Sequence, residues 1–259
     1  MHKSLTEGRI GTLLIKFSLP FLLSSLIMQA YSSVDVFILG HYAATESISG
    51  AGNGASLVMT VTSFFMGLSN GGMILLGQFF GAKQHEKSAR TIGNIVILQL
   101  CIVAVSMAIV VVLGRGFIRL IKVPEPADAE AWNYMRICSI GLAFNAGYGM
   151  VSSILRALGN SKTPLYFVSA ACVMNILLDL LFVGKFGWGA SGAALATVIS
   201  QAFSFGIAMV YMQYHSLPFR FTIEDIRPDK ELLRSMFKLG VPISLQTALN
   251  MVSFIWVGG

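Results

Sequence analysis

The chain has 259 residues, of which 55% are hydrophobic and 12% are charged, and its formal net charge is +6. A soluble domain carries about 25% charged residues, so this composition excludes an ordinary soluble domain and indicates a membrane protein. The basic excess does not indicate nucleic-acid binding. The lysines and arginines lie in short segments between apolar stretches, where they report membrane orientation.

The predicted elements are apolar helices, because about 20 helical residues cross the ~30 Å hydrocarbon core of a bilayer. Six complete spans are predicted at residues 13–39, 51–80, 92–113, 132–155, 164–184 and 190–214. A seventh apolar helix begins near Leu239. The fold class predicted is all-α: a polytopic membrane protein with a six-helix lobe at residues 1–214, a linker at 215–237 and the first helix of a second, truncated lobe at 238–259.

Helix-breaking residues occur in the first two spans. Pro20 lacks a backbone donor and is predicted to kink the first span. The second span is long, and its glycines are expected to let it bend or pack closely against a neighbour. These glycines are Gly67, Gly71, Gly72 and Gly77.

Lysine and arginine are distributed unevenly between the two sides of the predicted spans. The segment before the first span and the second, fourth and sixth loops carry most of them, whereas the first loop carries none. The positive-inside rule therefore predicts a cytoplasmic N-terminus. With a multi-pass topology, the expected location is a bacterial inner (plasma) membrane.

A weak internal repeat supports the division into lobes. The segment KFSLPFLLSS begins at Lys16 and KLGVPISLQT begins at Lys238, so that Pro20 aligns with Pro242. After an even number of spans, a second copy would enter the membrane in the same orientation as the first. We therefore expect this chain to be one lobe plus the start of another. In the linker, Asp229 is predicted to cap a short amphipathic surface helix. That helix would carry Leu232, Leu233, Met236 and Phe237.

Four polar residues lie inside the apolar spans and are candidates for a binding site: Asp35, Asn175, Asp179 and Thr197. Asn175 and Asp179 are four residues apart, so they share one helix face. Counted from the ends of their spans, Asp35 and Asp179 lie roughly 6–8 Å inside and Thr197 roughly 10 Å inside on the same side, so that the four groups are predicted to fall in one layer. Each residue alone has a structural explanation. Together they form a set of hard oxygen ligands, which suits a small cation such as Na⁺ or a proton shared between acids.

Sites for chemical catalysis are not indicated, so the chain is predicted not to be an enzyme. No Ser/His/Asp or Cys/His arrangement stands out in the sequence. Lys162 and Thr163 look like the end of a phosphate-binding loop, but Ser161 replaces the required glycine and Pro164 follows. Three cysteines in apolar spans are interpreted as small core residues, and no metal or other cofactor is predicted beyond the coupling ion. They are Cys101, Cys138 and Cys172.

Several segments resemble the multidrug and toxic compound extrusion (MATE) family. They are YSSVDVFILG, GLSNGGMILLGQFFGAK, LRALGNSKTP and NILLDLLFVGKFGWGASGAALAT. The resemblance that rests on them covers essentially the whole chain, as the N-terminal half of a family member. The resemblance implies a fold of two six-helix lobes that exports organic cations by alternating access, driven by Na⁺ or H⁺. Within the DinF-like branch, to which the match looks closest, it implies a cation site on Asp35, Asn175, Asp179 and Thr197.

The predicted function is therefore a cation-coupled antiporter that exports organic cations or drugs, here as a partial chain. The expected partners are the lipid bilayer, small organic cations, and either a missing second lobe or a second copy of the chain. A lipid-linked oligosaccharide flippase of the same superfamily and a non-functional or non-transporting fragment are the alternatives. Neither the substrate nor the choice between Na⁺ and H⁺ follows from the sequence.

Overall fold

The computed structural model describes residues 10–215 and 217–258, without the side chains of Ile10, residues 63–66, Ala248 and residues 250–258. This part of the chain contains only helices and the turns between them, which confirms the predicted all-α class. The elements are α1 (Ile10–Tyr42), α2 (Thr45–Gly81), α3 (His85–Leu120), α4 (Glu125–Ala157), α5 (Lys162–Asp179), a π-helix η1 (Leu180–Lys185), α6 (Gly189–Tyr214), a 3₁₀ turn η2 (Ile223–Asp225) and α7 (Lys230–Gly258).

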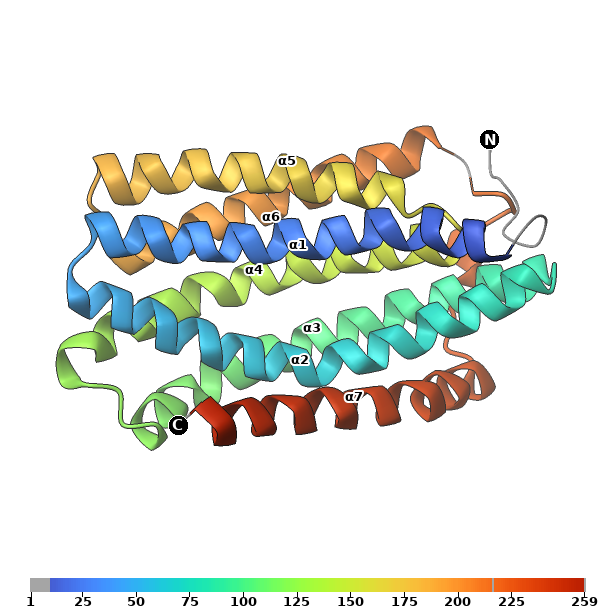
Figure 1. Cartoon of the computed structure of the whole chain (residues 1–259). Coiled ribbons are helices and arrows are strands. Elements are labelled where there is room, and N and C mark those ends of the chain that lie inside the picture. Colours follow the sequence, from blue (N-terminus) through green and yellow to red (C-terminus); the bar gives the residue numbers. More distant parts are fainter. Residues whose placement is uncertain (1–9, 216, 259) are drawn as a thin grey trace.

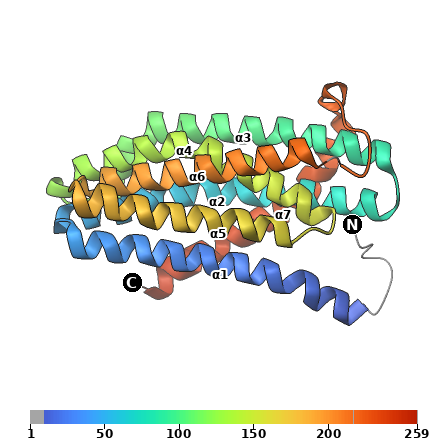
Figure 2. The ribbon, with the colours of Figure 1, turned by 90° about the horizontal axis from the view of Figure 1, so that it is seen from above.

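The long helices run side by side along one axis and alternate in direction (Figures 1 and 2). The start of α1, the α2–α3 turn, the α4–α5 turn and the end of α6 lie at one end of the bundle. The α1–α2, α3–α4 and α5–α6 connections lie at the other end (Figure 1). This alternation is the one that the loop charges required, and the loops that carry most of the lysines and arginines therefore share one end.

By length and composition, five of the described helices could each cross a membrane: α1, α3, α4, α5 with η1, and α6. The two halves of α2 make a sixth span if they are taken together. Together these match the six predicted spans, although several helices extend well beyond the predicted limits. α7 corresponds to the predicted seventh helix, but most side chains of its second half lie outside the described part.

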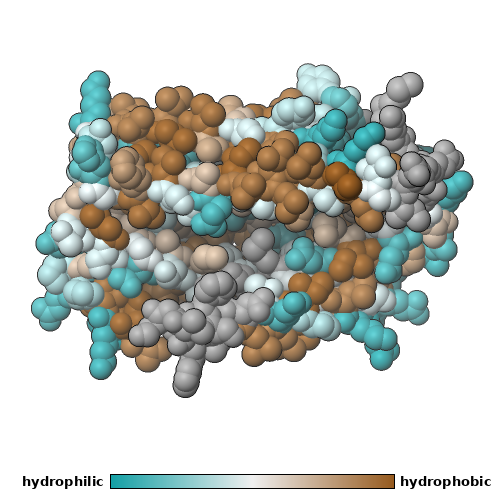
Figure 3. Space-filling view, viewed as in Figure 1, coloured by the Kyte–Doolittle hydropathy of each residue, from teal (hydrophilic) through white to brown (hydrophobic). Residues whose placement is uncertain are grey.

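Apolar side chains cover the outside of the bundle between two more hydrophilic ends (Figure 3). α1 contributes strongly to this surface, with Ile15 69% exposed and Phe37 73% exposed. In water such a surface would be unfavourable, whereas in a bilayer it faces hydrocarbon. The main apolar core lies between α2, α3, α4 and the start of α7.

α2 bends and packs closely against α7. The two halves of α2, Thr45–Thr62 and Gly67–Gly81, meet at 44°. A Cβ atom added at Gly71 would collide with the backbone of Met236 and Gly240, and one added at Gly240 would collide with Leu68. The predicted bend is thus present in α2, and its glycines allow α7 to approach at backbone distance. At Pro20, by contrast, α1 continues as one helix, and the buried Ser24 hydroxyl donates a hydrogen bond of 2.8 Å to the Pro20 carbonyl.

The linker after α6 is held against α3 rather than loose. Asn94, which is fully buried in α3, donates from Nδ2 to the Arg227 carbonyl at 3.2 Å and accepts from the Asp229 amide at 2.9 Å. Asp229 in turn caps α7 by accepting from the Glu231 and Leu232 amides, as predicted.

The helix that Asp229 caps differs from the short surface helix predicted for it. α7 runs without interruption from Lys230, eight residues before the predicted boundary at 238. Leu232 and Met236 are buried in the main apolar core, with Met236 fully enclosed. Only Phe237 remains largely exposed. The amphipathic pattern was recognised correctly, but its apolar face covers α2 and α3 instead of lying on a surface.

Candidate functional site

The structure brings the four predicted site residues together where α1, α5 and α6 meet. Asp35 comes from α1, Asn175 and Asp179 come from successive turns of α5, and Thr197 comes from α6. Asn175 and Asp179 have no exposed surface and Thr197 is 9% exposed. Counted from the ends of these helices at 1.5 Å per residue, the carboxylates and the hydroxyl lie roughly 9–12 Å inside. The layer is therefore deeper than predicted, because the helices are longer.

Most of the polar atoms in this layer are buried without a hydrogen-bond partner among the described residues. They are Asp35 Oδ1, both side-chain polar atoms of Asn175, both carboxylate oxygens of Asp179, and Thr197 Oγ1. Buried polar atoms in proteins are nearly always paired, and an unpaired one costs about 1–3 kcal/mol. Such a concentration of oxygens without partners in one layer fits a site that is completed by a cation or by added protons.

The two carboxyl groups are close enough to interact with each other. Two carboxylates that share a buried site repel when both are ionised. A Na⁺ ion between them would cancel this repulsion, and so would a proton shared by them. The donor set consists of oxygens, which suits such an ion and not a soft metal. The described residues contain no group of three or more His, Cys, Asp or Glu side chains that could hold a metal.

Three further side chains belong to this layer and were not predicted. Tyr31 of α1 interacts with Thr197 and with both carboxylates. Tyr134 and Cys138, one turn apart on α4, interact with Asp35. None of them donates a hydrogen bond to Asp35 Oδ1 or to the Asp179 carboxylate in the described part of the chain, so they surround the layer and leave these oxygens available to a cation or a proton. Tyr31 could have been found, because it lies four residues before Asp35 and therefore on the same face of α1.

The backbone beside Asp179 is irregular. α5 ends at Asp179, and the six residues that follow form the π-helix η1, from Leu180 to Lys185. Short π-helical turns are rare and occur often at functional sites, because the wider turn changes the direction of neighbouring side chains and frees backbone groups. η1 thus places Asp179 at the junction between two helical geometries. The sequence LLFVGK gave no sign of it.

A small cavity with a mostly apolar lining adjoins the site. It has a volume of about 50 Å³ and lies between α1, α4, α5 and α6. Its lining includes Tyr31 on the side of the carboxylates and Asn145, Ser200 and Gln201 on the other walls. A space of this size holds one or two water molecules and is too small for a drug molecule. Tyr31 therefore contacts this cavity and also interacts with the candidate cation site.

Comparison with known proteins agrees with this architecture. The family model MatE matches residues 20–181, which is more than half of the chain. The chain belongs to the MATE family. The matched region includes α1 from Pro20 onward and extends to η1, so it contains Asp35, Asn175 and Asp179.

Individual MATE proteins resemble this chain over most of its length. A probable multidrug resistance protein of Bacillus subtilis, YpnP, is 33% identical over 241 residues, which are 93% of this chain and 54% of that protein. The multidrug export protein MepA of Staphylococcus aureus is 26% identical over 249 residues, covering 91% of this chain and 52% of MepA. The chain thus spans about half the length of these relatives. Their names describe resistance and export, which supports a transport protein and not an enzyme and does not favour the flippase alternative.

A solved structure confirms the fold. An outward-facing multidrug resistance MATE family transporter of the MOP superfamily superposes with a TM-score of 0.85 at 21% identity. The superposition covers 93% of this chain and 53% of that chain. This chain is therefore a multi-pass membrane protein with the architecture found in part of a MATE transporter.

Proposed function

We propose that this chain provides the coupling half of a cation-driven multidrug efflux protein. The observation that carries the proposal is the buried layer of oxygens without partners on α1, α5 and α6, which contains Asp35 and Asp179. The half-length match to the relatives supports the view that the export path also needs a second lobe or a second copy of the chain. Organic cations are the proposed substrates, in line with a site whose ionisable groups are acidic.

In the proposed mechanism, the coupling ion, Na⁺ or H⁺, neutralises the repulsion between the two carboxylates. The side chains of Asp35 on α1 and Asp179 on α5 then approach each other, and α1 packs more closely against α5. When the ion leaves, repulsion favours a second arrangement of α1. Pro20 gives α1 a position where the helix can bend, because its ring removes one backbone hydrogen bond. An exported cation that binds the ion-free arrangement better would exchange with the ion.

The topology proposed with this mechanism has the N-terminus in the cytoplasm of a bacterium and the helices in its inner membrane. The end of the bundle that holds the basic loops then faces inward. Asp35, Asp179 and Thr197 lie nearer the opposite end, so the coupling ion would reach them from outside. This is the direction in which bacterial Na⁺ and H⁺ gradients drive entry.

Ethidium efflux in a bacterium that lacks its own multidrug transporters tests the proposal. The 259-residue chain is compared with a form extended by the second half of a full-length relative, and each carries Asp35→Asn, Asp179→Asn or no substitution. The expected result is export by the extended form alone and loss of export with either substitution. Asp128→Asn is the matched control, because Asp128 is an exposed carboxylate in the first turn of α4.

Three outcomes separate the alternatives. Export by the 259-residue chain alone would indicate that two copies assemble. Full export by Asp35→Asn or Asp179→Asn would contradict the proposed coupling site. Failure of every form to move ethidium or another cationic dye, with normal membrane insertion, would contradict drug export.

A further inference from the structure

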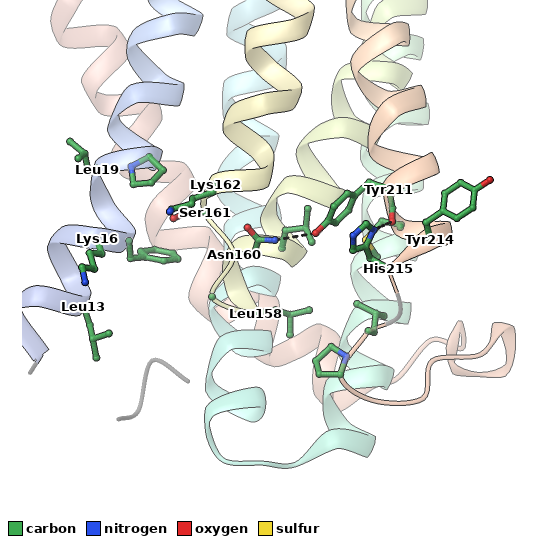
Figure 4. Close-up of a pocket in the computed structure, with 17 residues that line it drawn as sticks. Leu13, Lys16, Leu19, Leu158, Asn160, Ser161, Lys162, Tyr211, Tyr214 and His215 are labelled. Atoms are coloured by element: carbon green, nitrogen blue, oxygen red, sulfur yellow. Dashed lines mark hydrogen bonds between the residues drawn. The ribbon is translucent and has the colours of Figure 1, made fainter. Parts of the chain in front are cut away.

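A large cavity opens at the end of the bundle that carries the basic loops, far from the carboxylates. Its volume is about 850 Å³ (Figure 4). One wall is the first part of α1, and the opposite wall is the end of α6. The α4–α5 turn and the start of the linker complete it. The cavity is thus bounded by four separate segments, and its shape depends on where the beginning of α1 lies.

Basic side chains lie on several walls of this cavity. Lys16 on α1, Lys162 at the start of α5 and His215 at the end of α6 all line it, and no aspartate or glutamate is among the described lining residues. In Figure 4, Lys162 reaches from the start of α5 toward α1, the helix that carries Lys16. Neither lysine forms an ion pair with any described residue. The positive end of the α5 dipole adds to this potential.

Polar groups on the inner side of the cavity are fixed by their own hydrogen bonds. Asn160 caps the start of α5 by accepting from the Thr163 amide at 3.1 Å. Its Nδ2 donates to the Thr163 hydroxyl at 2.8 Å and to the Tyr211 hydroxyl at 3.4 Å (Figure 4). The Tyr211 ring stacks on the His215 imidazole with the ring centres 3.9 Å apart. These contacts hold hydroxyl and imidazole groups in place between the lysines and α6.

The cavity lies at the depth of lipid headgroups and beside lipid-facing surface. It is formed where α4 ends, α5 begins and α6 ends, so it lies at a boundary between apolar spans and water. Leu19, on its rim, is 55% exposed, and Tyr214 is 82% exposed. Its α1 wall also offers apolar side chains, from Leu13, Phe17 and Pro20. A ligand with an anionic head and an apolar tail could therefore enter from the membrane side.

We propose that this cavity binds the phosphate group of an anionic phospholipid. Phosphate oxygens only accept hydrogen bonds, and the cavity offers ammonium and hydroxyl donors. Basic pockets between transmembrane helices at a membrane surface are suited to such headgroups. The phosphate joins Lys16 on α1 to Lys162 on α5, and two positive charges that otherwise repel across the cavity are held together. Lipid binding thereby stabilises the position in which the start of α1 lies against the bundle.

Native mass spectrometry of the purified 259-residue chain in a neutral detergent tests this inference. Phosphatidylglycerol and phosphatidylcholine are titrated separately onto the unsubstituted chain and onto Lys16→Gln/Lys162→Gln. We expect the unsubstituted chain to bind phosphatidylglycerol about tenfold more tightly than phosphatidylcholine, and the double variant to lose this preference. The control is Arg234→Gln/Lys238→Gln, which removes the same charge from exposed positions on α7 outside the cavity.

A second titration, with inorganic phosphate, separates lipid from soluble phosphate. Displacement of phosphatidylglycerol by millimolar phosphate, dependent on both lysines, would support the site and assign a soluble source. Equal binding of the two lipids would overturn the inference, as would an equal loss in the control variant. Melting temperatures of all variants in phosphatidylcholine show whether each is folded. If only the cavity variant is unfolded, the single substitutions Lys16→Gln and Lys162→Gln are measured, and each is expected to weaken the preference.

Discussion

Asn175 is fully buried, and neither its amide nitrogen nor its oxygen has a hydrogen-bond partner in the described part of the chain. Its neighbour Asp179, one turn further along α5, is in the same condition. Residues of this kind lower the stability of a fold, because their desolvation is not compensated. Their placement one turn apart, next to the π-helix η1, is explained if a bound cation or proton supplies the missing interactions.

Replacing Asn175 with leucine is expected to stabilise the protein and to abolish its function. Leucine has the same branched arrangement of side-chain heavy atoms and leaves no polar atom unpaired, so the melting temperature should rise by an amount corresponding to about 1–2 kcal/mol. Ion-driven efflux should be lost in the extended protein. Thermal unfolding in detergent and ethidium efflux are the two measurements. A lower melting temperature together with normal efflux would show that Asn175 has a structural role instead.

The response to the coupling ion should depend on Asp179. We expect the melting temperature of the unsubstituted chain to change when Na⁺ replaces choline at constant ionic strength, or else when pH alone is changed. Asp179→Asn should remove whichever response is seen, because it removes the charge repulsion that the ion relieves. Asp128→Asn should keep it. A response unchanged in Asp179→Asn would place the ion elsewhere.

Among the helices, α2 is the one against which most of the others pack. It packs against α3, α4 and α7, it bends between Thr62 and Gly67, and its glycines provide the surface for α7. Glycine in a helix is normally unfavourable by about 1 kcal/mol relative to alanine. Its repeated use in α2 therefore reflects close packing of backbones, as in other membrane helices.

Two glycines of α2 make a matched pair for testing this packing. Gly71→Ala should lower the melting temperature, because the new Cβ would collide with the backbone of Met236 and Gly240 in α7. Gly52→Ala should leave stability unchanged or raise it by up to about 1 kcal/mol, since nothing lies within 4 Å of its added Cβ. Thermal unfolding of both variants in the same detergent measures whether Gly71→Ala lowers the melting temperature and Gly52→Ala does not. Equal effects would mean that α7 is not held closely against α2.

The linker offers a second test at this scale. Asn94→Ala removes the two hydrogen bonds that attach residues 227 and 229 to α3, and leaves the Asp229 amide without its acceptor. We expect proteolysis between residues 215 and 230 to become at least about tenfold faster, in keeping with a loss of roughly 1.5–3 kcal/mol. Limited proteolysis with mass-spectrometric identification of the cut measures this. An unchanged rate would show that the apolar contacts of Leu232 and Met236 are sufficient.

Sequence information was adequate for some of these features and not for others. The six spans were predictable, because apolar length is a direct requirement of the bilayer. The depth of Asp35, Asp179 and Thr197 followed from counting residues, although the true helix ends lie further out. η1 could not be predicted, because LLFVGK fits an α-helix equally well. The placement of Tyr134 and Cys138 in one cluster with Ile38 and Leu39 of α1 depends on the packing of the whole bundle, which a single sequence does not contain.

At the scale of the whole molecule, alternate loops gather at opposite ends, and the basic ones share an end (Figure 1). A charged cavity lies at that end and the acidic site lies toward the other. The two are connected by α1, whose beginning lines the cavity and whose later turns carry Tyr31 and Asp35. The orientation of this arrangement in the membrane is accessible to experiment.

Single cysteines at the two ends should label from opposite sides. In a background where Cys101, Cys138 and Cys172 are replaced by serine or alanine, Ala44→Cys should react with an impermeant maleimide on intact cells. Ile223→Cys, at a position that is 86% exposed in the linker turn, should react only after the cells are opened. The reverse pattern would invert the proposed topology.

α7 lies along α2, whereas α1, its counterpart in the sequence repeat, makes few contacts with α2 and leaves a broad apolar face uncovered. Suppose that a continuation of the chain repeats the pattern of this half. The second half would then contain its own equivalent of α2, with a surface like the one on which α7 packs here. α1 would be the helix that packs on that surface. Each half would then lend its first helix to the other, as in a domain-swapped dimer contained in one chain. A hybrid transporter that joins halves from two different relatives would therefore need matching first helices, and its best crossover point would follow α7 instead of preceding it.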